Sequence, residues 1–380
     1  MTRTWDIFCS VVDNYGDIGV CWRLARQLSI ELKQPVRLWV DDLVSLRRLC
    51  HGVDPAQTRQ FVGAVDVRRW SPAFTAVAPA DIVIEGFGVR LPRVYIEAMA
   101  ARQPRPVWVN LEYLSAESWV EGCHGLPSPQ PDGPLVKHFF FPGFTPATGG
   151  LLMESGLPQT RDAFQCDRAA VAAFRRSLGL VLPDSDALWV SLFCYDNAAL
   201  PALVDAWASD PLPIVCLVME GPALAQLSRI AGRTVAAGAG LNLGRLTIEA
   251  VPFVELDQYD RLLWACDMNF VRGEDSFVRA QLAARPLVWQ AYPQDEGAHL
   301  HKTAAFLGRY ASTLSADVRA PFCALMEAWN RESPAVRESW AALRPNLKAL
   351  EIHARYWAET LAGGGSLAVK LAEFCEDRLE

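Results

Sequence analysis

The chain has 380 residues, of which 51% are hydrophobic and 21% are charged, and its formal net charge is −7 with a pI near 5.5. One hydrophobic core rarely serves a chain of this length, so we expect two domains. The composition is that of a globular protein and excludes a disordered or fibrous one. The acidic charge gives no general attraction to nucleic acid or to an anionic membrane, and neither is an expected partner.

The cysteines and the N-terminus indicate a cytoplasmic protein. Ten cysteines are scattered without a CxxC pair, and several lie in apolar runs, so we expect buried thiols in a reducing compartment. The chain enters a strand almost at once, without the basic region, apolar stretch and cleavage site of a signal peptide. No apolar run approaches the roughly 18 residues of a membrane span. We therefore expect neither secretion nor membrane insertion.

The first half alternates short β-rich runs with amphipathic helical stretches, which is typical of parallel α/β sheets covered on both faces. The predicted strands are 5–12, 35–41, 82–86, 106–111 and 137–141, and the predicted helices are about 19–32, 43–50 and 90–103. The segment from Gly125 to Pro134 contains four prolines in ten residues, so we predict a surface loop there.

The second half repeats this pattern and predicts a second α/β unit. Its predicted strands are 187–194, 213–219, 246–253, 268–272 and 286–291, and its predicted helices lie near 198–208, 222–231, 256–266, 275–285 and 299–310. A glycine-rich stretch, 238–244, precedes a strand, which is the wrong order for a phosphate-binding loop.

These elements predict two Rossmann-like domains, with ligands in a central cleft at the carboxyl ends of both sets of strands. Residues 1–150 form the first domain and 184–332 the second, with a connection at 151–183. Residues 333–380 carry no strand pattern and are predicted to be helical, with the possibility that they cross back to the first domain.

The loop after the first predicted strand, Asp13 to Gly19, contains two carboxylates and two glycines and is followed by a helix. Glycine lets the backbone approach a ligand closely, and a helix N-terminus offers free amide donors. The loop is neither the dinucleotide GxGxxG motif nor a P-loop. A purely structural interpretation stays open, in which Asp13 turns the chain and Asp17 caps the helix.

A second informative loop, Arg272 to Ser276, follows the predicted strand 268–272. Arg272 beside the free amides of a helix start is a plausible clamp for a diphosphate. Asp275 or Ser276 is the expected N-cap of the helix. Glu274 is either a functional acid or a partner of the helix dipole.

Aromatic and amide side chains lie at other strand ends. Tyr195 and Phe253 could stack on a planar base, and Gln258 could bond the edge of a pyrimidine. Each of the aromatic residues could equally belong to a hydrophobic core.

The sequence carries no recognisable metal motif. It has no HExxH, no Cys/His cluster and no Asp-x-Asp doublet after a strand, and Asp41-Asp42 lacks the required spacing. We therefore expect no metal and no other cofactor, and helix ends and arginines would neutralise a leaving diphosphate.

Five segments together resemble the elongation factor P arginine rhamnosyltransferase family, called EarP: WDIFCSVVDNYGDIGVCWRLARQL, VRLWVDD, FFFPGFTPATGGLL, YDRLLWACDMNFVRGEDSFVRAQ and WQAYPQ. The resemblance implies a GT-B fold and an inverting, metal-independent glycosyltransferase. It implies dTDP-β-L-rhamnose as donor and one arginine of elongation factor P as acceptor, with the acceptor on the first domain and the donor on the second.

The resemblance also implies roles for individual residues. Asp17 would be the catalytic carboxylate, with Asp13 beside it and Glu274 as a second essential acid. The donor would be bound by Asn14, Tyr15, Gly16, Asp17, Tyr195, Phe253, Gln258, Arg272, Gly273, Glu274, Asp275 and Ser276. A guanidinium is a poor nucleophile, so a carboxylate that accepts its N–H bonds and takes its proton explains why acids are needed.

Three alternatives remain. One is a GT-B transferase that acts on a lipid or a small metabolite, although no basic amphipathic helix indicates membrane docking. Another is a non-catalytic nucleotide-sugar sensor, which would have no need of three acids at two strand ends. A Rossmann oxidoreductase is disfavoured, because its glycine fingerprint is missing.

Overall fold

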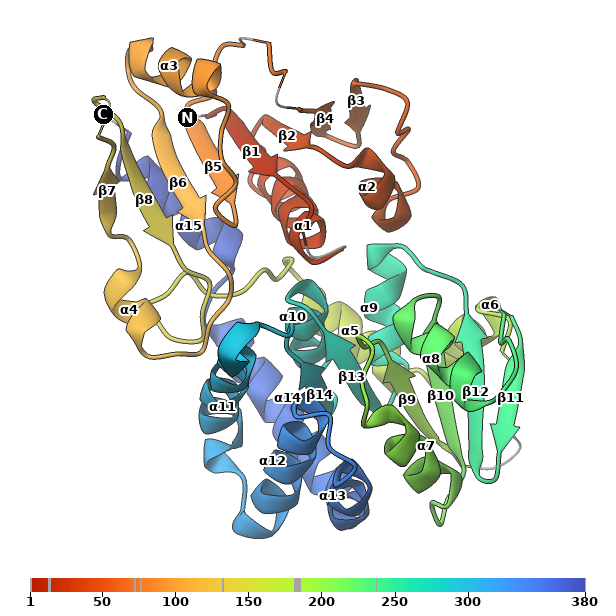
Figure 1. Cartoon of the computed structure of the whole chain (residues 1–380). Coiled ribbons are helices and arrows are strands. Elements are labelled where there is room, and N and C mark those ends of the chain that lie inside the picture. Colours follow the sequence, from red (N-terminus) through yellow and green to blue (C-terminus); the bar gives the residue numbers. More distant parts are fainter. Residues whose placement is uncertain are drawn as a thin grey trace. The chain divides into compact units, whose positions relative to one another are not determined.

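The structure is a computed structural model that describes residues 2–12, 15–71, 73–75, 77–131, 133–180, 186–236 and 238–379. The chain divides into two compact units (Figure 1). Unit 1 comprises Met1–Ser155 and Leu361–Glu380, and unit 2 comprises Gly156–Thr360. Most of the segment 151–183, expected to be a connection, belongs to unit 2, and its last three residues lie outside the described part of the chain.

Unit 1 contains an eight-stranded sheet with the strand order β3-β4-β2-β1-β5-β6-β8-β7. Its strands are β1 (Trp5–Cys9), β2 (Val36–Val40), β3 (Arg59–Val62), β4 (Val65–Arg69), β5 (Ile82–Gly86), β6 (Val107–Leu111), β7 (Pro127–Pro129) and β8 (Val136–Phe140). The six inner strands are parallel, and the edge strands β3 and β7 run antiparallel to their neighbours.

Helices cover both faces of this sheet. They are α1 (Gly16–Ile30), α2 (Leu43–Leu49), α3 (Arg93–Ala101), α4 (Trp119–Cys123) and α15 (Leu367–Glu376). Phe8 packs against Tyr95 of α3, with ring centroids 4.9 Å apart. Its neighbour Cys9 meets Cys21 of α1, and this contact raises the pKa of the Cys9 thiol. Because successive residues of a strand point to opposite faces, α3 and α1 cover opposite sides.

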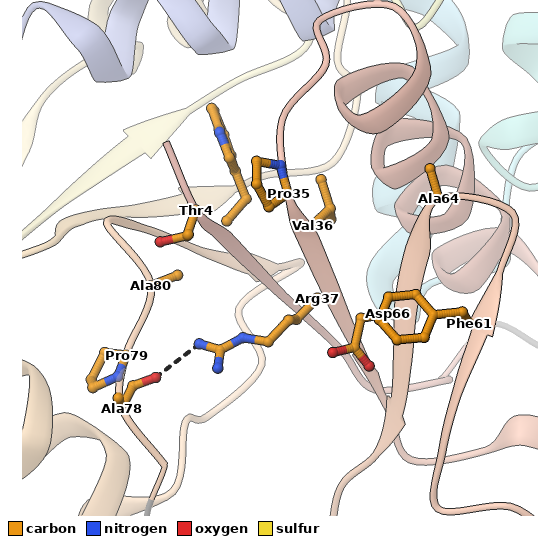
Figure 2. Close-up of a pocket in the computed structure, with 11 residues that line it drawn as sticks. Thr4, Pro35, Val36, Arg37, Phe61, Ala64, Asp66, Ala78, Pro79 and Ala80 are labelled. Atoms are coloured by element: carbon orange, nitrogen blue, oxygen red, sulfur yellow. Dashed lines mark hydrogen bonds between the residues drawn. The ribbon is translucent and has the colours of Figure 1, made fainter. Parts of the chain in front are cut away.

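A buried aspartate joins the strands of unit 1 near their amino ends. The carboxylate of Asp6 accepts hydrogen bonds from Arg37 Nε (2.6 Å) and from the indole nitrogen of Trp39 (2.8 Å). Arg37 also lines a pocket of about 420 Å³ and points across it toward Ala78, whose carbonyl accepts its hydrogen bond at 2.9 Å (Figure 2). This pocket lies at the amino edge, opposite the edge where such sheets bind ligands.

Unit 2 contains a six-stranded sheet with the strand order β11-β12-β10-β9-β13-β14. Its strands are β9 (Leu188–Leu192), β10 (Ile214–Met219), β11 (Gly240–Leu243), β12 (Leu246–Val251), β13 (Met268–Arg272) and β14 (Leu287–Gln290). All pairs are parallel except that of the edge strand β11 with β12.

The helices of unit 2 include α5 (Leu157–Cys166), α6 (Arg168–Ser177), α7 (Leu200–Ala208), α8 (Pro222–Ile230), α9 (Leu256–Trp264), α10 (Asp275–Leu282), α11 (Ala298–Tyr310), α12 (Ala316–Asn330) and α13 (Val336–Leu343). The long helix α14 (Leu347–Gly363) contains the division between the units. A buried ion pair ties α9 to α10, because Arg279 meets Asp260 at 2.6 Å with both side chains almost fully buried.

The predicted α/β class with two mostly parallel sheets is confirmed, and so is the helical character of the last fifty residues. Two predicted bounds were wrong: β1 ends at Cys9 and not at residue 12, and the segment from Gly125 to Pro134, expected to be a loop, contains the short edge strand β7. The glycine-rich stretch 238–244 precedes the strand β12, as predicted. The strands β3, β4 and β11 were not predicted.

All ten cysteines are free thiols, in agreement with the expected absence of a disulfide framework. Six of them are buried, as predicted, and burial raises the pKa of Cys194 to about 12. The expectation of burial was wrong for the exposed Cys166 and for the three partly buried thiols Cys50, Cys123 and Cys323.

Candidate active site

Each sheet has a topological switch point, where the chain leaves one strand and later returns on that strand's other side. In unit 1 it lies between β1 and β5, and in unit 2 between β9 and β13. Ligands of such sheets bind at the carboxyl ends of the strands beside this point. Asp17 follows β1, Tyr195 follows β9 and Arg272 ends β13. The predicted residues therefore lie at the two places that the topology favours.

Asp17 is buried at the switch point of unit 1, with 2% of its surface exposed. It lies in the first turn of α1, where the helix dipole favours a negative charge. One carboxylate oxygen accepts a hydrogen bond from the Val12 amide (2.9 Å), and the other accepts one from the Tyr113 hydroxyl (3.1 Å). Both oxygens are thus held in fixed directions. The N-cap position belongs to Tyr15, so the interpretation of Asp17 as the helix cap was wrong.

Tyr113 reaches Asp17 from the loop after β6, and its ring stacks on Phe87 with centroids 4.5 Å apart and an interplanar angle of 18°. Phe87 follows β5 directly and has a φ of +59°, which is rare for an aromatic residue. Its amide donates to the carbonyl of Leu111 (2.8 Å), which holds the strained backbone. Strain of this kind gathers at functional sites. The sequence analysis missed both aromatic residues, although Phe87 stands between two glycines directly after a predicted strand.

The loop between β1 and α1 is tied to the end of β2. Asp41 accepts hydrogen bonds from the Ser10 hydroxyl and from the Val11 amide, the latter at 3.0 Å. Asp42 caps α2 by accepting a hydrogen bond from the amide of Val44 (2.9 Å). The two residues that follow β1 thus bond Asp41, and β1 ends at Cys9. Both Asp41 and Asp42 accept hydrogen bonds from nearby backbone amides and hydroxyls in this structure.

The loop before Asp17 holds the other predicted residues of unit 1. Asp13 and Asn14 lie outside the described residues. Tyr15 and Gly16 are partly buried at the start of α1, and the Tyr15 carbonyl accepts the Gly19 amide at 2.9 Å. Both therefore lie next to Asp17, and their contact with the donor stays a prediction.

Glu112 is a further acid at this edge that sequence reasoning missed. It follows β6 and accepts a hydrogen bond from the Asn110 side chain at 2.5 Å. The Asn110 carbonyl oxygen in turn accepts the Gly88 amide (2.9 Å), which links β6 to the loop after β5. Burial raises the pKa of Glu112, and raised carboxyl pKa values are frequent at functional sites.

Arg272 is the main cation at the switch point of unit 2, and only 6% of its surface is exposed. Its guanidinium lies over the rings of Phe193, 4.6 Å from the centroid, and Tyr195, 4.3 Å from the centroid. Tyr195 also meets Tyr292 edge to face at 5.4 Å. Among the described residues, no carboxylate forms an ion pair with Arg272. A cation held in this way can bind an anionic ligand.

The turn after Arg272 leads directly into α10. Gly273 has a φ of +62°, and its carbonyl accepts the indole N–H of Trp289 at 2.9 Å. Glu274 occupies the N-cap position without a capping bond from its side chain, and α10 begins at Asp275. The prediction of Asp275 or Ser276 as the N-cap was therefore wrong. Glu274 lies at the helix N-terminus and is partly buried, a place that fits both interpretations made from the sequence.

The expected base-binding residues are spread over several strand ends. The backbone amide of Tyr195 donates a hydrogen bond to the side chain of Gln290 (2.9 Å), and the Tyr195 ring contacts the guanidinium of Arg272. Phe253 is partly buried after β12, and Gln258 is exposed in the first turn of α9. β10 stands between β12 and β9. The structure thus brings Tyr195 and Arg272 into contact and places Phe253 and Gln258 further along the same edge. Phe193, one of the two rings under Arg272, was not among the predicted site residues.

Within the described ranges, no group of three or more His, Cys, Asp or Glu side chains is placed to hold a metal ion. Metal-independent chemistry stays a prediction. None of the described helices is long and apolar enough to cross a membrane.

The chain is similar to known proteins along its whole length. Residues 5–376 match the model of the family described as Elongation-Factor P (EF-P) rhamnosyltransferase EarP. A protein-arginine rhamnosyltransferase of Pseudomonas putida KT2440 is 50% identical over 380 residues, which is 100% of both chains. A solved structure described as the structural basis for EarP-mediated arginine glycosylation of translation elongation factor EF-P is 36% identical, with a TM-score of 0.72 and 100% of both chains covered.

The fold is also shared with WaaG, described as a glycosyltransferase involved in lipopolysaccharide biosynthesis, at 12% identity and a TM-score of 0.50 over 98% of this chain and 99% of that one. Two α/β units of this kind and these similarities define a glycosyltransferase with the GT-B architecture. The chain belongs to the EarP family of elongation factor P rhamnosyltransferases. The resemblance seen in the sequence is therefore confirmed, and the roles of single residues stay predictions.

Proposed function

We propose that this protein transfers L-rhamnose from dTDP-β-L-rhamnose to an arginine side chain of elongation factor P in the cytoplasm, with inversion and without a metal. The observation that carries the proposal is the buried Asp17 carboxylate at the switch point of unit 1, with both oxygens held by hydrogen-bond donors. The descriptions of the related proteins support the rhamnosyl group, the arginine and the translation factor.

Asp17 is the proposed general base. A guanidinium is planar, delocalised and protonated at neutral pH, so its nitrogen is a weak nucleophile. A carboxylate that accepts its N–H bonds concentrates electron density on the attacking nitrogen and takes the proton as the new bond forms. Burial and the two anchored oxygens of Asp17 support this role, because they fix the direction in which the carboxylate accepts.

Asp13 and Glu274 are the proposed second and third acids of the reaction. One or both of them would hold the guanidinium or adjust the basicity of Asp17. Asn14, Tyr15 and Gly16, which belong to the same loop as Asp17, would line the donor sugar.

Arg272 is the proposed clamp for the diphosphate of the donor. The C–N bond forms on the face of the anomeric carbon opposite the leaving group, the C–O bond breaks, and dTDP leaves with the negative charge. The stacked guanidinium of Arg272 and the amides of Gly273 to Ser276 at the start of α10 would stabilise that charge, in the place of a metal. Tyr195, Phe253 and Gln258 are the proposed contacts of the thymine.

Intact-mass spectrometry of purified elongation factor P tests the proposal. The translation factor is incubated with this protein and dTDP-L-rhamnose, with and without a chelator. We expect a gain of one deoxyhexose, located on an arginine and unaffected by the chelator. A protein that binds dTDP in calorimetry but leaves the mass unchanged would contradict the acceptor and redirect the search to other nucleophiles. Loss of transfer with the chelator would contradict metal independence.

A further inference from the structure

We propose that Tyr113 is a positioning residue that sets the orientation of the Asp17 carboxylate for the reaction, and that Phe87 holds the Tyr113 ring in place. The inference rests on the proposed function, in which Asp17 is the base. It goes beyond that function because it assigns a role to two residues outside the loop and helix that carry the predicted acids.

The geometry around Asp17 supports this assignment. Rotation of a carboxylate about its last side-chain bond is only weakly restricted by the side chain itself. In this structure Val12 donates to Oδ2 at 2.9 Å and Tyr113 donates to Oδ1 at 3.1 Å. Two donors on different oxygens fix the plane of the carboxylate. That plane decides whether its lone pairs meet a guanidinium in the direction needed for proton transfer.

The support for the tyrosine is itself rigid. Tyr113 is 39% exposed as a residue, and the stack on Phe87 supplies packing for its ring on one side. Phe87 has a left-handed backbone and a hydrogen bond to Leu111 at the end of β6. A left-handed backbone costs free energy in a residue such as phenylalanine and persists where the surrounding structure holds it. Here it places the Phe87 ring against the Tyr113 ring, whose hydroxyl donates to Asp17.

The Tyr113→Phe variant removes only the hydroxyl and retains the stack. We expect kcat to fall about ten- to a hundredfold, because small errors in the placement of a reacting group have effects of that size. The KM for dTDP-L-rhamnose and the melting temperature should stay close to those of the unaltered protein. The Phe87→Leu variant retains the hydroxyl but loosens the ring, so its kcat should fall less.

A double variant separates action through Asp17 from a general structural effect. If Tyr113 acts through Asp17, adding Tyr113→Phe to Asp17→Asn should lower the residual rate no further, since coupled residues are not additive. The matched control is Tyr356→Phe on α14, which removes a hydroxyl from a tyrosine that is 57% exposed and distant in sequence from every proposed site residue. Its rate should equal that of the unaltered protein.

The outcomes distinguish this inference from the proposed function. If the unaltered protein does not rhamnosylate elongation factor P, the proposed function fails and the inference fails with it. If the unaltered protein and Tyr356→Phe are active and Tyr113→Phe is equally active, only the inference is overturned. A Tyr113→Phe variant that loses melting temperature and donor affinity along with its rate also overturns it, because the tyrosine would then be structural. A loss of kcat alone supports it.

Discussion

The switch points of the two sheets carry opposite chemistry. At the carboxyl edge of unit 1, Asp17 is buried and accepts two hydrogen bonds, and Glu112 follows β6, two strands from β1. At the carboxyl edge of unit 2, Arg272 lies over two aromatic rings. The first edge holds a negative charge through polar contacts, and the second holds a positive charge through ring faces.

In the proposed reaction, this difference would let one fold serve two halves of the chemistry. Both sites have the same topological position, so the fold provides the location and the side chains provide the chemistry. Transfer of a sugar to a guanidinium needs a base for the acceptor and a positive charge for the departing diphosphate. The account therefore predicts that damage at the two edges has different kinetic consequences.

The largest effect is expected from Asp17→Asn, which retains the size of the side chain and removes its ability to take a proton. We expect the rate of rhamnose transfer to fall about a thousandfold, within the range for loss of a general base. Single-turnover intact-mass measurements on elongation factor P would provide the rate. Transfer within a few fold of the unaltered protein would show that another group is the base.

A smaller effect is expected from Arg272→Lys at the other edge. A lysine retains the charge but loses the planar fork and its stacking on two rings, so we expect donor affinity to fall about tenfold. Initial rates over a range of dTDP-L-rhamnose concentrations would show this as a raised KM. The matched control is Arg229→Lys, since Arg229 forms a surface ion pair with Asp196 and both side chains are more than half exposed. Equal KM values for the two variants would contradict the clamp.

The smallest effect concerns Glu112 and the dependence of stability on pH. Burial raises the pKa of Glu112, so the folded state binds its proton more tightly than the unfolded chain does. The contribution of Glu112 to stability is therefore full in acid and is lost as the pH rises through the raised pKa. Glu112→Gln retains an acceptor for Asn110. Because its amide does not ionise, its contribution to stability does not fall as the pH rises. We expect its melting temperature to exceed that of the unaltered protein near pH 7 and to converge with it near pH 4.

Glu97→Gln serves as the control for that experiment. Glu97 pairs with Arg93 on the surface of α3, and its side chain is 63% exposed. Exposed pairs contribute little to stability, so this variant should follow the unaltered protein at both pH values. A melting temperature for Glu112→Gln that stays at or below that of the unaltered protein at pH 7 would contradict the burial argument.

The sequence was sufficient for the parts of this molecule that depend on local pattern. Alternating strands and amphipathic helices predicted two α/β units, and the same pattern placed Asp17 after one strand and Arg272 at the end of another, where the structure has them. The contact of Tyr113 with Asp17 joins residues 96 positions apart and depends on the order of the strands, which no local pattern specifies. The edge strands β3, β7 and β11 have three or four residues each, too few for a clear alternation.

The helix starts show a second limit. Asp and Ser are favoured N-caps, yet Tyr15 and Glu274 occupy these positions in the structure. Asp17 is the second residue of α1, and its carboxylate accepts a hydrogen bond from the Val12 amide. Residue type alone could nominate Asp17 for function but could not distinguish a helix cap from a buried carboxylate inside the first turn.

Calorimetric titration of dTDP into the unaltered protein, Asp17→Asn and Arg272→Lys tests the division between the two edges most directly. The account predicts that Asp17→Asn binds dTDP with unchanged affinity, while Arg272→Lys binds it about tenfold more weakly. Equal weakening in both variants, or unchanged binding by Arg272→Lys, would contradict the assignment of the diphosphate to unit 2 and of the base to unit 1.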